Sequence, residues 1–136
     1  MKKRFEKAVV SDIPAATEFL EEALEALGCP QKTVFQMDTV LDEIFCNVVQ
    51  YAYPEGQPGP VELTAEAGED GRTFVLTIED AGRPFNPLKQ KAPDITASAE
   101  ERTPGGLGIY IVRKLTDEVA YAYKDGKNIL RITKRY

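Results

Sequence analysis

Two β-hairpin patterns restrict the fold of this chain more than any other feature of its sequence. In the first, residues 61–66 and 74–79 alternate apolar and polar side chains around a glycine-containing connection. In the second, residues 117–123 and 128–133 flank another glycine-containing turn. An antiparallel hairpin commonly buries one face and leaves the other in water. The sequence therefore predicts an antiparallel sheet whose apolar face needs a cover.

Two longer stretches with apolar side chains at helical spacing supply that cover. Residues 13–27 follow Ser11 and Asp12, whose side-chain oxygens are typical of helix caps, and we expect one of them to cap this helix. Residues 33–52 repeat the pattern over a longer stretch, and a cluster of prolines and glycines ends it. We expect a further short helix at 108–115 and a first strand at 4–10, where the alternation is poor.

The order of these elements predicts an α+β fold. About five strands and three helices would form a two-layer α/β sandwich, in which the helices cover one face of a mixed, mainly antiparallel sheet. A chain of 136 residues is long enough to bury a core, so we expect residues 1–136 to form a single domain.

Several classes of function conflict with the composition. The net charge of −5 disfavours direct binding to nucleic acids, whose phosphates attract basic surfaces. No stretch resembles a signal peptide or a membrane span, so we expect a cytoplasmic protein with reduced cysteines. The chain has no histidine, which excludes Ser-His-Asp triads, Cys-His pairs and autophosphorylation on histidine. Acid–base chemistry must therefore use carboxylates, lysines or tyrosines.

Glu43 and Asn47 lie four residues apart in the second predicted helix, so their side chains share one side of it. One explanation is an ordinary solvated polar face, because most charged side chains are exposed. The other is a site in which the amide oxygen of Asn47 binds Mg²⁺ and the carboxylate of Glu43 handles a proton. Mg²⁺ accepts few protein ligands beside phosphate oxygens and waters, so one amide oxygen suffices. The sequence pattern leaves both explanations open.

Asp80 and Gly82 follow the strand predicted at 74–79, and two explanations fit them as well. Asp and Gly are common where a strand ends in a turn, for reasons of backbone conformation alone. Alternatively, the Asp80 carboxylate accepts a hydrogen bond from an amino group such as that of adenine. In that case Gly82 would let the flat base approach the backbone closely.

A glycine-rich segment, Gly105-Gly106-Leu107-Gly108, precedes the last predicted helix. It is either a flexible helix entry or an anion site, because free N–H groups at a helix N-terminus attract phosphates. Arg102 is either a solvated loop charge or an added donor for a terminal phosphate. A loop as long as the one before these glycines usually signals function or disorder. The spacing matches neither the Walker phosphate-binding loop nor the GxGxxG motif.

Taken together, three segments resemble the N, G1 and G2 boxes of GHKL-type ATPases, and in particular those of the bacterial anti-sigma-factor serine/threonine kinases. The segments are Leu41-Asp42-Glu43-Ile44-Phe45-Cys46-Asn47, Asp80-Ala81-Gly82-Arg83-Pro84-Phe85-Asn86-Pro87 and Gly105-Gly106-Leu107-Gly108-Ile109-Tyr110-Ile111-Val112. The resemblance covers nearly the whole chain. It implies a Bergerat-type ATP-binding fold, the histidine-kinase-like ATPase domain, which is a two-layer sandwich of the kind predicted above.

The resemblance also implies a role for each matching residue. Glu43 would be the catalytic base, Asn47 the ligand of the Mg²⁺ ion that accompanies the nucleotide, and Asp80 the residue that recognises adenine. The remaining nucleotide-binding residues would be Gly82, Arg102, Gly105, Gly106, Leu107, Gly108 and Asn128. ATP and Mg²⁺ are therefore the expected cofactors.

The activity that the resemblance implies is protein phosphorylation. Such a kinase transfers the γ-phosphoryl group of ATP to a serine of a STAS-type anti-anti-sigma partner and regulates transcription by partner switching. The resemblance also allows a sigma factor as a second partner, and a homodimer. The alternative is a catalytically silent module that binds a regulatory protein in a nucleotide-dependent way and sequesters it. Tight ATP binding without turnover on any partner would select this alternative.

Overall fold

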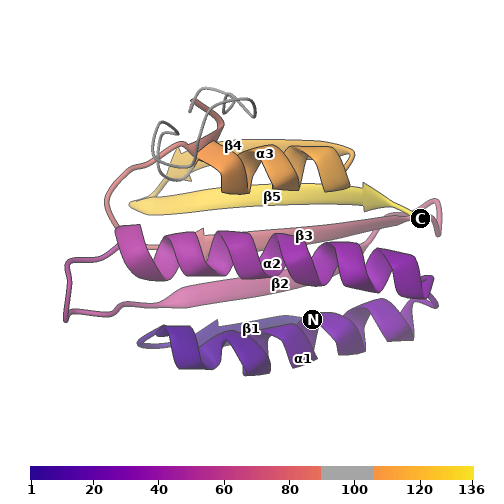
Figure 1. The fold of residues 1–136 in the computed structure, drawn as a ribbon, viewed down its shortest axis with the longest axis horizontal. Coiled ribbons are helices and arrows are strands. Elements are labelled where there is room, and N and C mark those ends of the chain that lie inside the picture. Colours follow the sequence, from indigo (N-terminus) through magenta and orange to yellow (C-terminus); the bar gives the residue numbers. More distant parts are fainter. Residues whose placement is uncertain (90–105) are drawn as a thin grey trace.

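The computed structural model describes residues 1–89 and 106–136, which form a sheet and a layer of helices (Figure 1). The elements, in chain order, are β1 (Lys2–Phe5), the 3-10 helix η1 (Val10–Asp12), α1 (Ile13–Ala26), α2 (Gln31–Tyr51), β2 (Val61–Ala67), β3 (Thr73–Asp80), the 3-10 helix η2 (Pro87–Lys89), α3 (Gly106–Leu115), β4 (Glu118–Lys124) and β5 (Lys127–Arg135). None of the helices in these two described ranges is both long and apolar enough to cross a membrane.

β3 lies at the centre of a sheet with the strand order β1-β2-β3-β5-β4. Every pair of neighbouring strands in the described part of the chain is antiparallel, so this sheet is antiparallel rather than mixed. Short connections join β2 to β3 and β4 to β5, as the two hairpin patterns predict. The predicted α+β sandwich is therefore confirmed. The register places Asp80 of β3 opposite Asn128 of β5.

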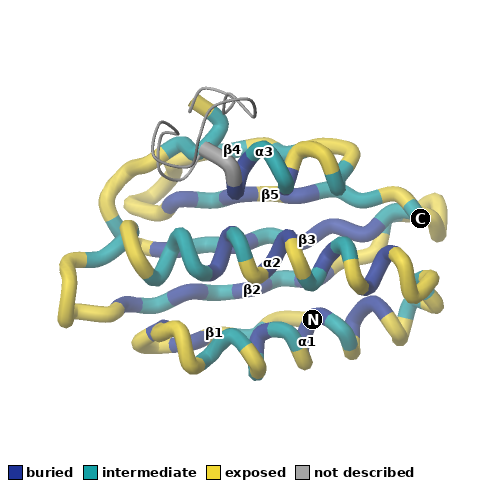
Figure 2. Tube along the Cα trace, in the orientation of Figure 1, coloured by how far each residue is buried: buried dark blue, intermediate teal, exposed yellow. Residues whose placement is uncertain are grey.

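The helices of the described ranges lie over one face of the sheet, with α2 between α1 and α3 (Figure 1). Buried residues alternate with more exposed ones along β2, as the colours of Figure 2 show. The side chains between the two layers form one core, and its largest fully buried members include Leu20, Leu24, Met37, Leu41, Phe45 and Phe74. Because this core is closely packed, it fixes the position of α2 over the sheet.

α2 carries the apolar stripe that the sequence predicts, and only its C-terminal end departs from the core. Met37, Leu41 and Phe45 are completely buried, each with 0% exposure. Val48 in the last turns and Ala52 just after them are half-buried instead. The helical cover over the sheet is therefore incomplete at this end, which lies next to the end of β3.

The N-terminal strand is shorter than predicted. β1 ends at Phe5, and the backbone N–H of Ala8 already donates to the carbonyl of Gly59 at 2.9 Å. Val9 and Val10 belong to the predicted strand, yet they lie beyond β1 and are 39% and 55% exposed. The poor alternation in this stretch has a physical cause, since its two buried residues, Phe5 and Ala8, are three positions apart and only Phe5 belongs to the strand.

The helix cap predicted for Ser11 or Asp12 is wrong. The carboxylate of Asp12 accepts a hydrogen bond from the backbone N–H of Val9 at 2.9 Å, which closes the turn of η1 just before α1. α1 itself begins at Ile13 without a side-chain cap. Pro14 in its first turn has no N–H group and so leaves one donor fewer to satisfy there.

Candidate functional site

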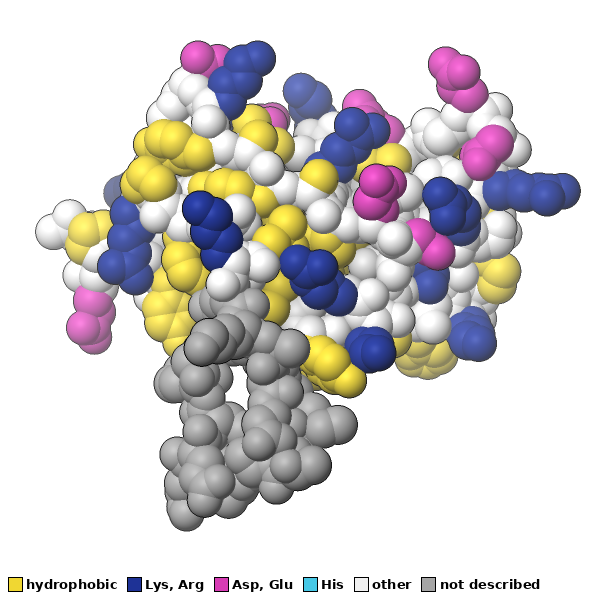
Figure 3. Space-filling model, turned by 90° about the horizontal axis from the view of Figure 1, so that it is seen from above, with side chains coloured by type: hydrophobic (Ala, Val, Ile, Leu, Met, Phe, Trp, Pro, Cys, Tyr) yellow, Lys and Arg dark blue, Asp and Glu magenta, His cyan; other side chains and the backbone are white. Residues whose placement is uncertain are grey.

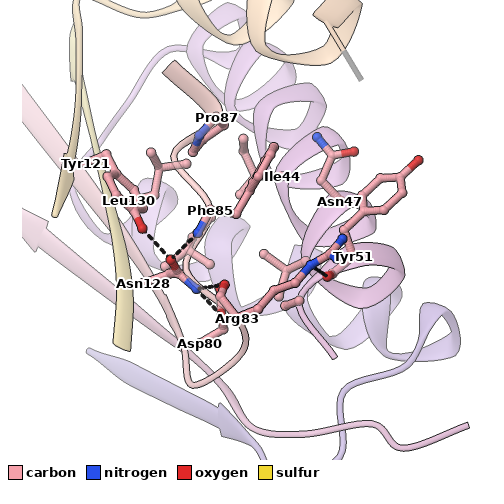
Figure 4. A pocket seen from close by; sticks show the side chains of 13 residues that line it. Ile44, Asn47, Tyr51, Asp80, Arg83, Phe85, Pro87, Tyr121, Asn128 and Leu130 are labelled. Atoms are coloured by element: carbon pink, nitrogen blue, oxygen red, sulfur yellow. Dashed lines mark hydrogen bonds between the residues drawn. The ribbon is translucent and has the colours of Figure 1, made fainter. Parts of the chain in front are cut away.

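A cavity of about 190 Å³ opens between the last turns of α2 and the ends of β3 and β5 (Figure 4). Its walls are mostly apolar and include Ile44 of α2 and Leu130 of β5. A few polar side chains converge on it, namely Asn47, Asp80 and Asn128. Pockets for whole drug-sized ligands commonly measure roughly 300–1,000 Å³, so this cavity suits a single ring system. An apolar cavity with few convergent polar groups is the usual form of a small-molecule site.

Asp80 supplies a buried carboxylate to this cavity and is only 7% exposed. Its Oδ1 accepts two hydrogen bonds of 2.9 Å, from the backbone N–H of Gly82 and from the Nδ2 of Asn128. Burial raises the pKa of Asp80, and the two hydrogen bonds partly offset the rise because they stabilise the charged form. The residue therefore presents a partly desolvated acceptor at the position that the sequence predicts for adenine recognition.

Gly82 has a packing role that its sequence neighbourhood does not reveal. A Cβ atom there would lie 2.2 Å from the carbonyl oxygen of Ala52, so only glycine fits against the end of α2. Arg83 is hydrogen-bonded to the same end of α2. Its backbone N–H donates to the carbonyl of Ala52 at 3.0 Å, and its Nε donates to the carbonyl of Tyr51 at 2.9 Å. Gly82 is not among the described residues that line the cavity beside Asp80. Close backbone packing therefore requires glycine at this position, and its predicted contact with a base stays a prediction.

Tyr53 completes the attachment between α2 and the turn after β3. Its hydroxyl accepts a hydrogen bond from the backbone N–H of Ala81 at 2.8 Å and donates one to the carbonyl of Pro60. The sequence pattern gives this tyrosine no role. The one signal that could have found it is its place directly before the proline- and glycine-rich turn, where an aromatic ring can anchor the chain.

Glu43 and Asn47 of α2 lie against the start of α3. Gly108 is buried there, and a Cβ atom on it would come within 2.8 Å of the Oε2 of Glu43 and 3.5 Å of the Nδ2 of Asn47. Both polar side chains are half-buried, and Asn47 also lines the cavity. The start of α3 therefore covers this pair in part, and the pair is not a fully exposed polar face. Three of the predicted site residues meet here from two different helices.

The other residues of the glycine-rich segment are less fully described. Arg102 and Gly105 lie outside the described residues. Gly106 and Leu107 are described only as the first residues of the helix α3. A phosphate-binding role for these four positions stays a prediction.

Asn128 at the start of β5 is 7% exposed and connects the residues around the cavity (Figure 4). Its Nδ2 donates to Asp80 and, at 2.8 Å, to the carbonyl of Arg83. Its Oδ1 accepts from the backbone N–H of Phe85 at 3.0 Å and from the hydroxyl of Tyr121. The sequence did not predict the hydrogen bond from Tyr121 to Asn128, because nothing in the alternation of β4 distinguishes this tyrosine from other strand tyrosines.

Basic side chains occur on η2 and at the end of α3, although the whole chain has a net charge of −5. Figure 3 shows Lys and Arg side chains together with Asp and Glu side chains among apolar ones on the face that this view presents. Arg113 and Lys114 occupy the last turn of α3, and Lys89 ends η2, whose first residue, Pro87, lines the cavity. The Nη2 of Arg113 donates to the carbonyl of Leu88 at 3.4 Å and so links α3 to η2.

Comparison with curated proteins finds relatives along most of the chain. The chain is similar to the serine-protein kinase RsbW of Bacillus cereus (strain AH187), with 29% identity over 139 residues that cover 96% of this chain and 86% of the relative. It is also similar to the serine/threonine-protein kinase BtrW of Bordetella bronchiseptica, with 29% identity over 99 residues that cover 73% of this chain and 68% of the relative.

Two solved structures share the fold. One contains the RsbU and RsbW domains of a Mycobacterium tuberculosis protein, with a TM-score of 0.69 and 15% identity; the match covers 99% of this chain and 32% of that chain, so the present chain spans about a third of it. The other is the SiaB–SiaC complex of Pseudomonas aeruginosa, with a TM-score of 0.66 and 19% identity, where the match covers 96% of this chain and 88% of that chain.

A family model matches nearly the whole sequence. It is described as the histidine kinase-like ATPase domain, and the match runs over residues 7–134. This range contains the described cavity and every site residue predicted from the sequence. The resemblance to GHKL-type ATPases is thereby confirmed, and the protein belongs to the histidine kinase-like ATPase domain family.

Proposed function

We propose that this protein is an ATP-dependent serine kinase of the anti-sigma-factor type, which phosphorylates a serine of a STAS-type anti-anti-sigma partner. One observation carries the proposal: the buried carboxylate of Asp80 reaches an apolar cavity that Asn47 also lines, beside Glu43. The names of the relatives, which are protein kinases, support the activity. We also propose a cytoplasmic location, where ATP is available as the phosphoryl donor.

The cavity would hold the adenine base. The amino group of adenine would donate a hydrogen bond to Asp80, and apolar walls such as Ile44 would keep water away from the ring. Hydrogen bonds to a charged acceptor are roughly twice as strong as neutral ones, so this contact orients the base. The triphosphate would extend toward the start of α3, where free backbone N–H groups favour anions.

Asn47 fits the chemistry of a magnesium site. It lines the cavity, it is half-buried beside Glu43, and its amide oxygen is a ligand of the kind that Mg²⁺ accepts. When bound there with ATP, the ion would neutralise charge on the phosphates. The rest of its coordination would come from phosphate oxygens and water, as is usual for nucleotide-bound Mg²⁺.

Glu43 is the candidate base for the transfer. The serine oxygen of the partner forms a bond to the γ-phosphorus of ATP, the bond from that phosphorus to the bridging oxygen breaks, and ADP leaves. The Glu43 carboxylate takes the proton of the serine hydroxyl. A positioned base contributes a factor of roughly 10²–10⁴ to such a rate. Positioning of the phosphates and neutralisation of their charge supply much of the remainder.

The partner would bind at the mouth of the cavity, because its serine has to reach the γ-phosphate. A relative in fold, SiaB, is seen in a complex with SiaC, which supports a protein partner for this chain as well. We propose a sigma factor as the second partner and a homodimer as the assembled form, both on the likeness to RsbW. Exchange between the two partners would then regulate transcription.

The test is incubation of the full chain with a STAS-domain protein, Mg²⁺ and γ-labelled ATP. We expect label on a serine of the partner, and we expect Glu43→Gln to slow the transfer by a factor of roughly 10²–10⁴ because the base is lost. ADP binding, measured by calorimetry, should change little, because Glu43 is not among the described residues that line the base cavity. Glu55→Gln, in the exposed turn after α2, is the matched control.

Two outcomes would contradict parts of this proposal. Label transfer at the normal rate by the Glu43→Gln variant would show that this residue is not the base. Tight ATP binding without transfer to any STAS-domain protein would support the silent, nucleotide-dependent binding module instead.

A further inference from the structure

We infer that Asn128 is a positioning residue that limits Asp80 to one hydrogen bond with the base and thereby selects adenine over guanine. This inference rests on the proposed function, because it concerns the specificity of the same cavity. It also changes the role predicted for Asn128 from a direct nucleotide contact to one that acts through Asp80.

The amide of Asn128 has no capacity left for a ligand. A side-chain amide offers two N–H donors and an oxygen that accepts two hydrogen bonds. Both donors are used, by the Oδ1 of Asp80 at 2.9 Å and by the carbonyl of Arg83 at 2.8 Å. Both acceptor positions are also used, by the N–H of Phe85 at 3.0 Å and by the hydroxyl of Tyr121. A nucleotide would have to break one of these four bonds to reach this amide.

Backbone groups fix the direction in which the amide points. The carbonyl of Arg83 can only accept a hydrogen bond, and the N–H of Phe85 can only donate one. If the oxygen and nitrogen of Asn128 exchanged places, both contacts would become repulsive. The Nδ2 atom therefore stays toward Asp80. Both Asp80 and Asn128 are 7% exposed, so water competes little for their polar atoms.

Asp80 is consequently left with one oxygen for the cavity. Its Oδ1 accepts hydrogen bonds from Gly82 and Asn128, each at 2.9 Å, and a carboxylate oxygen has about two acceptor positions. The Oδ2 atom receives no hydrogen bond from the residues that the structure describes, and Asp80 lines the cavity. The carboxylate thus offers a ligand one acceptor atom instead of two.

Adenine and guanine differ in what they present to such an acceptor. The edge of adenine that carries the 6-amino group has one donor next to a ring nitrogen acceptor, and it needs one carboxylate oxygen. Guanine has two adjacent donors, at N1 and the 2-amino group, which need two oxygens for a bidentate contact. A single free oxygen satisfies adenine, whereas it leaves one guanine donor buried without a partner, which weakens binding. The network around Asn128 therefore favours adenine.

The first test uses the unmodified full chain with ADP, GDP and inosine diphosphate as competitors of a fluorescent ADP. Inosine has the N1 donor of guanine without the 2-amino group, so it reports whether a second donor is used. We expect GDP to bind about tenfold or more weakly than ADP, and also more weakly than inosine diphosphate, because GDP alone carries a second donor that the single free oxygen cannot accept. A GDP affinity equal to or above that of inosine diphosphate would overturn the inference. Failure to bind ADP would contradict the proposed function itself.

The second test releases the Oδ1 of Asp80 with Asn128→Ala. GDP should then gain about tenfold over inosine diphosphate, and the preference for ADP over GDP should fall by a similar factor. Ile132→Ala on the same strand is the control, because it removes a fully buried core side chain and should lower stability while both ratios stay unchanged. A folded Asn128→Ala protein with unchanged ratios would overturn the inference. If this variant does not fold, the comparison of GDP with inosine diphosphate on the unmodified chain still decides.

Discussion

Two carboxylates of this protein are enclosed in different ways. Asp80 at the end of β3 accepts two hydrogen bonds on one oxygen, and this residue lines a cavity. Asp38 in the middle of α2 lies beside Glu21 of α1, and its Oδ1 is buried without a partner among the described residues. Burial, together with the neighbouring Glu21, raises the pKa of Asp38 to about 7.

The difference shows what marks a binding site in this fold. Burial raises the pKa of both carboxyl groups, so a raised pKa alone does not separate them. Asp80 has donors that hold its charged form in one orientation, and it has space beside it for a ligand. Asp38 has the acidic Glu21 beside it, and this neighbour together with burial disfavours the charged form of Asp38. This contrast supports the recognition role that we propose for Asp80, whereas for Asp38 we expect only a cost in stability.

Asp80→Asn should have the largest effect, because it removes from the cavity the charged carboxylate that distinguishes Asp80 from Asp38. The new amide would bring an N–H group toward the amino group of adenine or toward the N–H of Gly82, so we expect ADP binding to weaken by about a hundredfold or more, roughly 2.8 kcal/mol. Calorimetry with ADP measures the loss. Glu79→Gln, one residue earlier and on the opposite face of β3, should keep the normal affinity. Normal ADP binding by Asp80→Asn would mean that this carboxylate has no part in recognition.

Asn128→Ala would make the surroundings of Asp80 resemble those of Asp38. Loss of four hydrogen bonds from a buried amide should lower the free energy of unfolding by roughly 2–3 kcal/mol, measured in urea. The pKa of Asp80 should rise further, because one donor to its charged form disappears. Carboxyl chemical shifts followed by NMR give that pKa. Ile129→Ala, the next residue and on the opposite face of β5, is the control, and an unchanged pKa of Asp80 would refute the role of Asn128.

The backbone N–H of Gly82 donates the second hydrogen bond to Asp80, and Gly82→Ala tests this contact by disturbing the packing of Gly82 against Ala52. The added methyl group would collide with the carbonyl of Ala52, so the free energy of unfolding should fall by roughly 2 kcal/mol and ADP should bind more weakly. Gly56→Ala is a useful control, because that glycine has a φ of 77° and open space around it. Strain alone should then lower stability by roughly 1 kcal/mol without changing ADP affinity. Equal ADP affinities of Gly82→Ala and the unmodified chain would exclude a role of this packing in the site.

Asp38→Asn should have the smallest effect and should stabilise the protein. The folded state raises the pKa of Asp38 from 3.8 to about 7, so it binds this proton more tightly than the unfolded chain does. Stability therefore falls as the pH rises from about 4 to about 7, by roughly 1 kcal/mol after allowance for partial exposure of this carboxyl. Urea unfolding at several pH values should show that fall, and Asp38→Asn should remove most of it. The exposed Asp42→Asn should retain it; an identical pH profile for both variants would exclude Asp38 as the cause.

The fold could be predicted from the sequence wherever an element repeats its pattern over many residues. Helices predicted at 13–27 and 33–52 appear at Ile13–Ala26 and Gln31–Tyr51, because long apolar stripes have only one packing solution over a sheet. The first strand could not be placed correctly, since the chain leaves the sheet after Phe5 and its later residues bond to a distant turn. Local alternation does not report such a departure.

In the candidate site, too, some residues could be predicted from the sequence, whereas the contacts between elements could not. Glu43, Asn47 and Asp80 could be proposed because each occupies a definite place on a helix or strand with a clear pattern. The packing of Gly82 against Ala52 and the contact of Tyr121 with Asn128 depend on side chains and carbonyls that only the tertiary fold brings together. A local pattern gives residue types and faces, but it does not give distances between elements.

The hydrogen bond between Asp80 and Asn128 joins residues that are 48 positions apart, and the second of them lies on the last strand. A ribosome therefore exposes the central strand well before its polar partner emerges from the exit tunnel. The growing chain cannot present the complete cavity at that stage, so a nucleotide that binds there, as we propose, cannot guide the early folding steps. Nucleotide should instead stabilise the fold by mass action only once β5 has joined the sheet.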